Sequence, residues 1–243
     1  VYEFLYKYRV LPVTISKTCL ESYKEFYHLG NGALITNGRS PVYPTSDENS
    51  VKTEIGKFKL HPDDKVFLHV ARVHPVKNQQ LLFDTFDRLI YEGEHVLLVV
   101  IGKGYDKEPF VKYNAHPGIH LLGEKRNVGD YLASADYFIM SSKMEGLPIS
   151  LLEAMSMGVI PVSTPAGGVC DVIRNGENGY LSVSHTANDY YHTVKDAIAN
   201  SKKVSSIAIK QEYQEHYSMV ACAKKYFQLF GVIACRVNGL QGT

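Results

Sequence analysis

Short apolar segments alternate with helical segments over most of the chain after residue 65. Strands that are continuously apolar, and that alternate with helices, are typical of a parallel sheet covered by helices on both faces. The sequence therefore predicts an α/β fold built on a Rossmann-like parallel sheet. The predicted strands are 66–71, 96–101, 119–122, 137–140 and 159–162, with a short one at 179–181.

The segments between and around these strands complete the expected fold. Ahead of the sheet we expect a strand at 10–16, a helix capped by Ser16 or Thr18 that runs to about Tyr27, and a strand at 34–36. The polar segment 39–56 is interpreted as a linker or exposed loop, and residues 238–243 as a frayed end. The predicted helices are 77–91, 108–114, 128–134, 148–157, 169–173, 187–199, 204–216 and 218–230.

Composition excludes several classes of function. The apolar fraction is 45%, enough for a sizeable core, and the net charge of +1 indicates neither a nucleic-acid track nor a polybasic membrane patch. The longest apolar run, 96–101, is far shorter than the roughly 20 residues of a membrane span. The four cysteines are widely separated and read as reduced intracellular thiols. The first residue is not methionine, which is consistent with a fragment of a longer protein.

Polar or glycine-rich residues follow each of the five main predicted strands. Ligands of open parallel sheets bind outside the carboxyl ends of the strands. Because these ends meet at one edge of the sheet, the sequence predicts a ligand site there. The segments concerned are Arg72, 102–104, 123–127, 141–146 and 164–168.

The carboxylates of Glu145 and Glu153 lie eight positions apart, the first on a loop and the second within a short helix. Pro148 suits the first position of that helix, and Gly158 suits the residue just past its end. A helix start presents unpaired N–H groups that favour phosphate. Phosphates flanked by carboxylates that accept hydroxyl groups match the layout of a nucleotide sugar. The alternative is that both glutamates are solvated surface charges.

Two further segments extend this site. Arg72 would leave a strand tip and Lys77 would begin a helix, and two cations beside a helix start favour a diphosphate. The turn containing Gly167 and Gly168 would let backbone approach a ligand. The alternatives are two surface cations and an ordinary tight connection between strand and helix.

Other chemistries lack their motifs. The Gly102-Lys103-Gly104 segment does not have the spacing of a dinucleotide-binding fingerprint. The ten histidines show no pair at metal-ligand spacing in the expected cleft, so His69, His74, His116 and His120 are interpreted as packing or surface residues. We therefore expect neither a metal nor a cofactor at the site.

The same residues carry a resemblance to a known family. Residues 145–153 fit the E-x7-E signature of retaining glycosyltransferases of the two-Rossmann-domain GT-B type, and their context EGLPISLLEAMSMGVIPVSTPAGG resembles glycosyltransferase family 4. The segment ARVHPVKNQ is similar to that family's stretch for the donor diphosphate. LPVTISK and LITNGRSPV resemble the end of the acceptor domain and the crossover to the donor domain. The resemblance covers about residues 10–185, and Asp171 stands where members often carry Glu.

The resemblance implies a role for each matching position. The donor would be a nucleoside diphosphate sugar of the UDP or GDP type, whose leaving diphosphate is stabilised by side-chain cations rather than by a metal. Glu145 would bind hydroxyls of the transferred sugar and Glu153 those of the ribose. The remaining assignments are Arg72 and Lys77 to the diphosphate, backbone N–H groups near Leu147 and Ile149 to the distal phosphate, and backbone around Glu124 and Lys125 to the base. Gly146 and Gly167 would also take part in binding the donor.

The resemblance also implies a domain organisation. Residues 1–40 would be the remnant of an N-terminal acceptor domain and the crossover, 41–217 the nucleotide-sugar-binding domain, and 218–243 the helix and tail that cross back. Turnover would then need the missing N-terminal domain and a carbohydrate or lipid-linked acceptor. Polysaccharide biosynthesis in the cytoplasm, with peripheral association of the full-length protein at the inner face of the membrane, is the implied setting.

Two alternatives remain open. A module that senses nucleotide sugars without catalysis would use the same binding residues. A non-hydrolysing sugar-nucleotide epimerase shares the architecture, but it should carry a cluster of catalytic acids and histidine at the domain cleft, and the sequence shows no such cluster.

Overall fold

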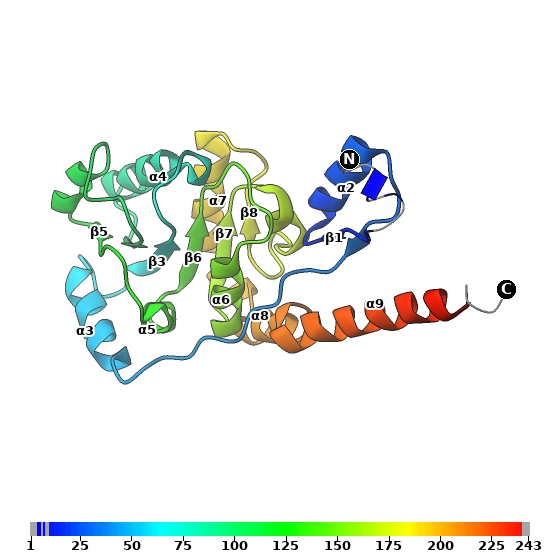
Figure 1. The fold of residues 1–243 in the computed structure, drawn as a ribbon. Helices are drawn as coiled ribbons and strands as arrows, with labels where there is room; N and C mark the ends of the chain where they lie inside the picture. The colour runs from blue at the N-terminus through cyan, green and yellow to red at the C-terminus, as the bar shows by residue number, and fades with distance from the viewer. Residues whose placement is uncertain (1–3, 6, 8–9, 240–243) are drawn as a thin grey trace.

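The computed structural model describes residues 4, 5, 7 and 10–239, with side chains up to residue 234. Its centre is a six-stranded sheet in which every neighbouring pair is parallel, in the order β5-β4-β3-β6-β7-β8 (Figure 1). The predicted parallel α/β sheet is confirmed. The strands are β3 Lys65–Val70, β4 Val96–Ile101, β5 Ile119–Leu121, β6 Tyr137–Met140, β7 Ile160–Ser163 and β8 Tyr180–Leu181.

The strand order contains one reversal of direction. The chain builds outward from β3 through β4 to β5, and then returns to place β6 on the other side of β3. The connections after β3 and after β6 therefore leave neighbouring strands and diverge at the same edge. In open α/β sheets this arrangement opens a crevice for ligands. The segments after Val70 and after Met140 meet at this point.

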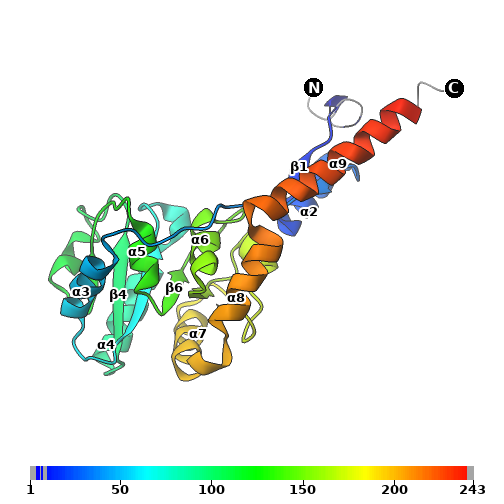
Figure 2. The same cartoon turned by 90° about the horizontal axis from the view of Figure 1, so that it is seen from below.

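Helices cover both faces of the sheet, as predicted (Figures 1 and 2). Helices α4 and α7 pack against each other and against β4 and β7, while α3, α5, α6 and α8 form a contacting row on the other face. The helices are α2 Lys17–Tyr27, α3 Glu48–Phe58, α4 Gln79–Tyr91, α5 Val128–Ala133, α6 Ile149–Met157, α7 Ala187–Ala199, α8 Ser206–Glu212 and α9 Met219–Gly239. Shorter turns are η1 Pro75–Lys77, η2 Val111–Ala115, η3 Gly167–Asp171, η4 Ser201–Lys203 and the π-helical turn η5 Tyr213–Tyr217.

Aromatic rings fill the core on the α4 side of the central strands. The ring of Phe67 on β3 stacks on Tyr137 of β6 with centroids 4.4 Å apart, and its edge meets Phe86 of α4 at 5.1 Å. All three side chains are completely buried. Aromatic pairs of this geometry stabilise the core beyond their buried area. This cluster locks β3, β6 and α4 together beneath the crevice.

A small unit stands beside the main sheet at the N-terminal end. Strands β1 Val13–Thr14 and β2 Ala33–Leu34 pair in parallel around α2. Of the two predicted caps, Ser16 is the one used, since its side chain accepts a hydrogen bond of 3.1 Å from the Cys19 N–H. Helix α2 also contacts η3 of the larger unit.

The prediction that residues 39–56 form a linker or loop is wrong for its second half. Helix α3 begins at Glu48, and Val51 and Ile55 on one of its faces are buried. These two residues lie at i and i+4, which is the helical spacing. The surrounding polar residues masked that short apolar face in the sequence.

Several boundaries also differ from the predicted ones. Asn78 is left-handed, with φ 52°, and separates η1 from α4, so α4 begins at Gln79 rather than at Lys77. Pro148 is extended and precedes α6, whereas Gly158 ends that helix in the left-handed conformation as predicted. Helix α9 continues to Gly239, so the predicted frayed end does not hold for residues 238 and 239. Residues 240–243 lie outside the described residues.

Gly158 offers a test of the packing of α6. It has φ 73°, and a Cβ there would lie 2.7 Å from the carbonyl oxygen of Ser206 at the start of α8. We expect G158A to lower the free energy of unfolding by about 2–3 kcal/mol through backbone strain plus this clash. Gly176 has φ 78° with open space around it, so G176A should lose only about 1 kcal/mol from strain. Urea unfolding of both variants measures the difference, and equal losses would contradict the packing role.

His69 on β3 offers a test of burial. Its Nδ1 lies 2.8 Å from the Ile139 carbonyl, Nε2 has no partner, and burial lowers the pKa of the ring to about 4. Because the folded pKa lies below the unfolded value, this group stabilises the protein above pH 6.5 and loses that effect as the pH falls towards 4. Between pH 7 and 4.5 the loss should be about 2–3 kcal/mol. H69N keeps a donor for Ile139 but cannot titrate, so its free energy of unfolding should fall less over the same range.

Candidate functional site

An ion pair joins the two loops that diverge at the reversal of strand order. Nζ of Lys77, at the end of η1, lies 2.6 Å from Oε1 of Glu145, and the Ser142 hydroxyl donates to the same oxygen at 2.6 Å. Both charged side chains are largely buried, with 27% and 12% of their surfaces exposed. A charge pair in such surroundings is screened less than one at the surface. The predicted neighbours Lys77 and Glu145 are therefore in direct contact.

Arg72 leaves β3 at the same edge, but its side chain is exposed. Within the described part of the chain, the guanidinium has no hydrogen bond or ion pair, so its full positive charge is open to a ligand. Its backbone is fixed, because the Arg72 carbonyl accepts a hydrogen bond of 2.9 Å from the Gln79 side chain. Arg72 is thus an available cation and Lys77 a cation already paired.

The first turn of α6 lies beside this pair and has no cap of its own. The preceding residue is Pro148, which offers no side-chain acceptor to the first N–H groups of the helix. Leu147 is buried, whereas Ile149 at the helix start is exposed. An uncapped helix start directs free N–H groups and a partial positive charge at whatever lies in front of it. An anion would satisfy those groups.

A glycine pair supports the Glu145 loop from behind. Gly168 donates a backbone hydrogen bond of 3.1 Å to the Glu145 carbonyl, and a Cβ on Gly168 would lie only 1.7 Å from the Gly146 carbonyl oxygen. Gly167 has φ 53°, and a Cβ there would lie 2.3 Å from the Glu145 carbonyl oxygen. Glycine is needed here because backbone meets backbone. Gly167 therefore approaches the Glu145 loop closely, and the approach of its backbone to a ligand stays a prediction.

The N-terminal unit reaches the same place. The Lys17 N–H at the start of α2 donates to Oδ2 of Asp171 at 2.6 Å. A Cβ on Gly146 would lie 2.9 Å from the Ile15 side chain. Asp171, whose shorter side chain departs from the related pattern, therefore holds the start of α2 against η3.

Glu153 lies within α6, as predicted, and its side chain is only 15% exposed. Its Oε1 lies 2.7 Å from Nη2 of Arg39, a residue of the linker between β2 and α3. The sequence reasoning missed Arg39, because nothing in the linker's composition indicates which helix it runs beside. The only sequence signal is that a charged residue follows the Asn37-Gly38 turn.

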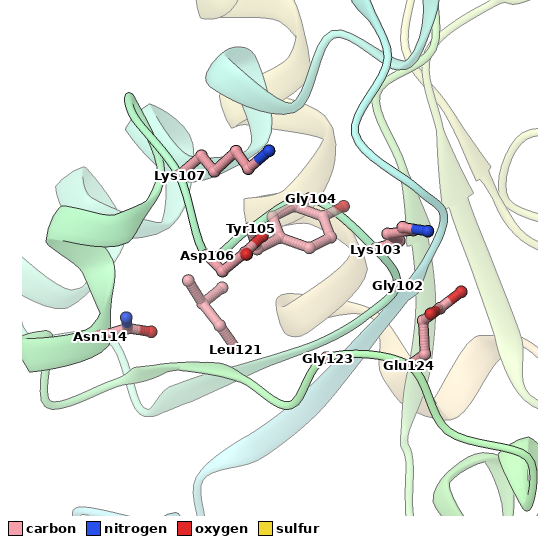
Figure 3. A pocket seen from close by; sticks show the side chains of 10 residues that line it. All are labelled: Gly102, Lys103, Gly104, Tyr105, Asp106, Lys107, Asn114, Leu121, Gly123 and Glu124. Atoms are coloured by element: carbon pink, nitrogen blue, oxygen red, sulfur yellow. The ribbon is translucent and has the colours of Figure 1, made fainter.

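A cavity of about 420 Å³ opens at the carboxyl ends of β4 and β5 (Figure 3). It adjoins the Arg72 loop, because the Val73 N–H donates to the Lys103 carbonyl at 2.8 Å and Gly102 packs against Ala71. The Gly102–Gly104 segment lacks the spacing of a dinucleotide motif, but the sequence places it at this edge of the sheet, and it forms one wall of the cavity. The lining residues are Gly102, Lys103, Gly104, Tyr105, Asp106, Lys107, Asn114, Leu121, Gly123 and Glu124.

The site residues that the sequence predicts therefore form separate but neighbouring groups along the carboxyl edge of the sheet. Lys77, Glu145, Gly146 and Gly167 form a contacting cluster at the start of α6, with Arg72 on the adjoining strand tip. Glu124 lines the cavity, whereas Lys125 turns its ammonium towards the Tyr131 ring, 5.7 Å from the centroid.

A group of metal-ligand type lies elsewhere. Among residues 10–234, His61, Asp64 and His95 place one ligand atom each within 4.8 Å of the others. They lie just before β3 and β4, at the edge opposite the candidate site. Over the described residues, no helix combines the length and the apolarity needed to cross a bilayer.

Comparison with known proteins places most of the chain in a protein family. Residues 50–214 match the family described as Glycosyl transferases group 1. N-acetyl-alpha-D-glucosaminyl L-malate synthase of Bacillus anthracis is 31% identical over 144 residues, which cover 58% of this chain and 37% of that protein. Glycogen synthase of Pseudomonas aeruginosa is 30% identical over 149 residues, covering 58% and 29%. The chain thus spans about a third of the length of these relatives.

Solved structures resemble the whole described fold. Alr3699/HepE of Anabaena, solved in complex with UDP and glucose, superposes with a TM-score of 0.76 at 18% identity, covering 94% of this chain and 65% of that one. A glycosyltransferase of Rickettsia africae superposes with a TM-score of 0.80 at 15% identity, covering 96% and 67%. The family match covers more than half of the chain, and the fold agrees with it. The chain therefore belongs to the group 1 glycosyltransferases, family 4, and corresponds to the C-terminal, nucleotide-sugar-binding region of their GT-B fold.

Proposed function

We propose that this chain is the donor-binding half of a retaining hexosyltransferase. It would bind a nucleoside diphosphate sugar and deliver the hexosyl group to a carbohydrate or lipid-linked acceptor. The observation that carries the proposal is the convergence of Lys77, Glu145 and the uncapped start of α6 at the reversal of strand order. This combination supplies cation, acid and N–H donors within one small region.

The diphosphate would lie between Arg72, Lys77 and the start of α6. Arg72 would bind phosphate oxygens through its fork of N–H donors, and Lys77 would act as a point charge. The N–H groups near Leu147 and Ile149 would receive the distal phosphate. As the bond to the sugar breaks, negative charge grows on the leaving diphosphate. Positive groups already fixed in place stabilise that charge without having to reorganise.

The rings at either end of the diphosphate would meet carboxylates. Glu145 would accept hydrogen bonds from hydroxyls of the transferred sugar, and Glu153 from those of the ribose. The cavity along Gly123 and Glu124 would hold the base. UDP is the first candidate, because Alr3699/HepE was solved with UDP and with UDP-glucose. GDP is the second.

Catalysis would need a second domain that presents the acceptor. Helix α9 extends away from the sheet, and the exposed fractions of Phe227, Phe230 and Val232 are 82%, 61% and 51% (Figure 2). Exposed apolar side chains of this kind mark interaction surfaces. Helices α9 and α2 would hold the acceptor domain above the donor site. Such a protein would work in the cytoplasm or at the inner face of the membrane, in polysaccharide synthesis.

A module that senses nucleotide sugars is the second candidate. The same donor site supports this function, because a sensor has to bind the nucleotide sugar but needs no surface for an acceptor. The two functions differ in what α9 and α2 would contact, an acceptor domain or a regulatory one.

The diphosphate assignment predicts the effect of removing either cation. We expect R72A and K77A each to weaken UDP binding by about 2 kcal/mol, the scale of charge-assisted contacts. K77A should lose more, because it also leaves Glu145 unpaired beside the phosphates. Isothermal titration calorimetry with UDP and with uridine separates the effects, since uridine affinity should not change.

The matched control is K202A, which removes an exposed lysine on η4 away from the site. If R72A and K77A bind UDP as tightly as K202A does, the diphosphate assignment is wrong.

The proposed division of labour predicts that the chain alone binds donor but does not transfer sugar. Incubation with UDP-hexoses and a panel of carbohydrate and lipid acceptors, followed by mass spectrometry, should show binding without a glycosylated product. Robust transfer by the isolated chain would overturn the need for a second domain.

A further inference from the structure

The linker between β2 and α3 runs alongside α6 instead of crossing open solvent (Figure 2). Its central contact is the ion pair of 2.7 Å between Arg39 and Glu153. Hydrogen bonds of 3.3 Å flank this pair on both sides, so the linker follows α6 in a fixed register. They run from Asn37 Nδ2 to the Leu147 carbonyl and from the Val42 N–H to the Ser156 hydroxyl.

The backbone of Arg39 is held at the start of α9. Arg39 forms a parallel bridge with Ser218, the extended residue that separates η5 from α9. The Arg39 N–H donates to the Tyr217 carbonyl at 3.0 Å, and the Arg39 carbonyl accepts from the Met219 N–H at 3.2 Å and from the Tyr213 hydroxyl. Because these hydrogen bonds fix the backbone of Arg39, the position of its Cα relative to α6 is also fixed.

The ion pair involves only one of the two carboxylate oxygens of Glu153. Oε1 faces Nη2 of Arg39, whereas no described group donates a hydrogen bond to Oε2. A glutamate side chain that lacks a partner samples several rotamers, and ordering it on ligand binding has an entropic cost. Arg39 removes that freedom beforehand and leaves one oxygen free to accept hydroxyl groups.

An ordinary surface ion pair is the competing explanation, because the Arg39 side chain is 44% exposed. Exposed pairs contribute little to stability. Three features separate this pair from that class: the clamped Arg39 backbone, the 15% exposure of Glu153, and the burial of the Arg39 Nε atom without a partner. An arginine kept for solubility alone would not leave a buried donor unpaired.

We propose that Arg39 is a positioning residue for recognition of the donor's ribose. It holds the Glu153 carboxylate so that Oε2 accepts hydrogen bonds from the ribose hydroxyls, without itself touching the nucleotide. This inference rests on the proposed function. It also ties ribose recognition to the junction of the linker and α9.

The test uses nucleotides that differ only in the ribose hydroxyls. Calorimetry would compare the nucleoside diphosphate that binds best among UDP, GDP and ADP with its 2′,3′-dideoxy analogue. Wild-type protein should prefer the ribose form by about tenfold or more, the scale of hydrogen bonds to a charged group. E153Q should lose most of this preference. R39Q should reduce it to within about threefold while leaving the dideoxy affinity unchanged, and R39K should restore part of it.

R88Q is the matched control. It breaks the Arg88–Glu92 pair, also 2.7 Å long and half-exposed, at the end of α4. This variant should keep the wild-type preference, and thermal melts would establish that each variant folds. If R39Q does not fold, R39K carries the test through a reduced preference.

The failures are distinguishable. A wild-type preference retained in R39Q, or an equal loss of affinity for both nucleotides, overturns the positioning role and leaves the donor site standing. A wild-type protein that ignores the ribose hydroxyls also overturns it. If wild-type protein binds no nucleoside diphosphate at all, the proposed function fails and this inference fails with it.

Discussion

The parallel pairing of β3 with both β4 and β6 is the constraint from which the site follows. Strand β4 lies on one side of β3, and β6, which comes later in the chain, pairs in parallel on the other side. The loops that follow β3 and β6 therefore leave the same edge of the sheet. The buried stack of Phe67, Tyr137 and Phe86 fixes these strands to α4. Lys77 and Glu145, which are 68 positions apart, can meet only because of this pairing. A ligand between them would be held by loops that are anchored on the buried central strands.

The loops at this edge support one another through backbone contacts. Gly168 lies against Gly146, and Gly102 lies against Ala71, at distances where any Cβ would overlap a carbonyl oxygen. Each loop is therefore shaped by its neighbour as well as by its own sequence. Side chains that would face a ligand, such as Arg72 and Glu145, project from loops whose backbones have little room to shift. Rigid loops of this kind are what preorganised charge stabilisation requires.

The sheet and the central cluster could be predicted from the sequence because their signals are local or topological. The sequence itself shows the apolar strands, the helix end at Gly158 and the polar residues after each strand. Parallel pairing of the strands then places Lys77 and Glu145 at one edge of the sheet. Helix α3 was missed because only Val51 and Ile55 reveal its buried face. The segment 102–104 was expected at this edge from its place after a strand, and it lines the cavity there. Arg39 was missed because its role depends on which distant segment it contacts. No local pattern encodes that choice.

The ion pair of Lys77 with Glu145 has a consequence for selectivity between whole donors and bare anions. Inorganic phosphate or pyrophosphate could recruit Lys77 only by separating it from Glu145, and would leave that carboxylate facing an anion. An intact sugar nucleotide would also bind Lys77 through its diphosphate, but its sugar hydroxyl groups would donate hydrogen bonds to Glu145. In the structure Lys77 and Glu145 neutralise each other. Under the proposed function, loss of the sugar would remove the hydroxyl groups from Glu145, and the two side chains could pair again as the diphosphate leaves.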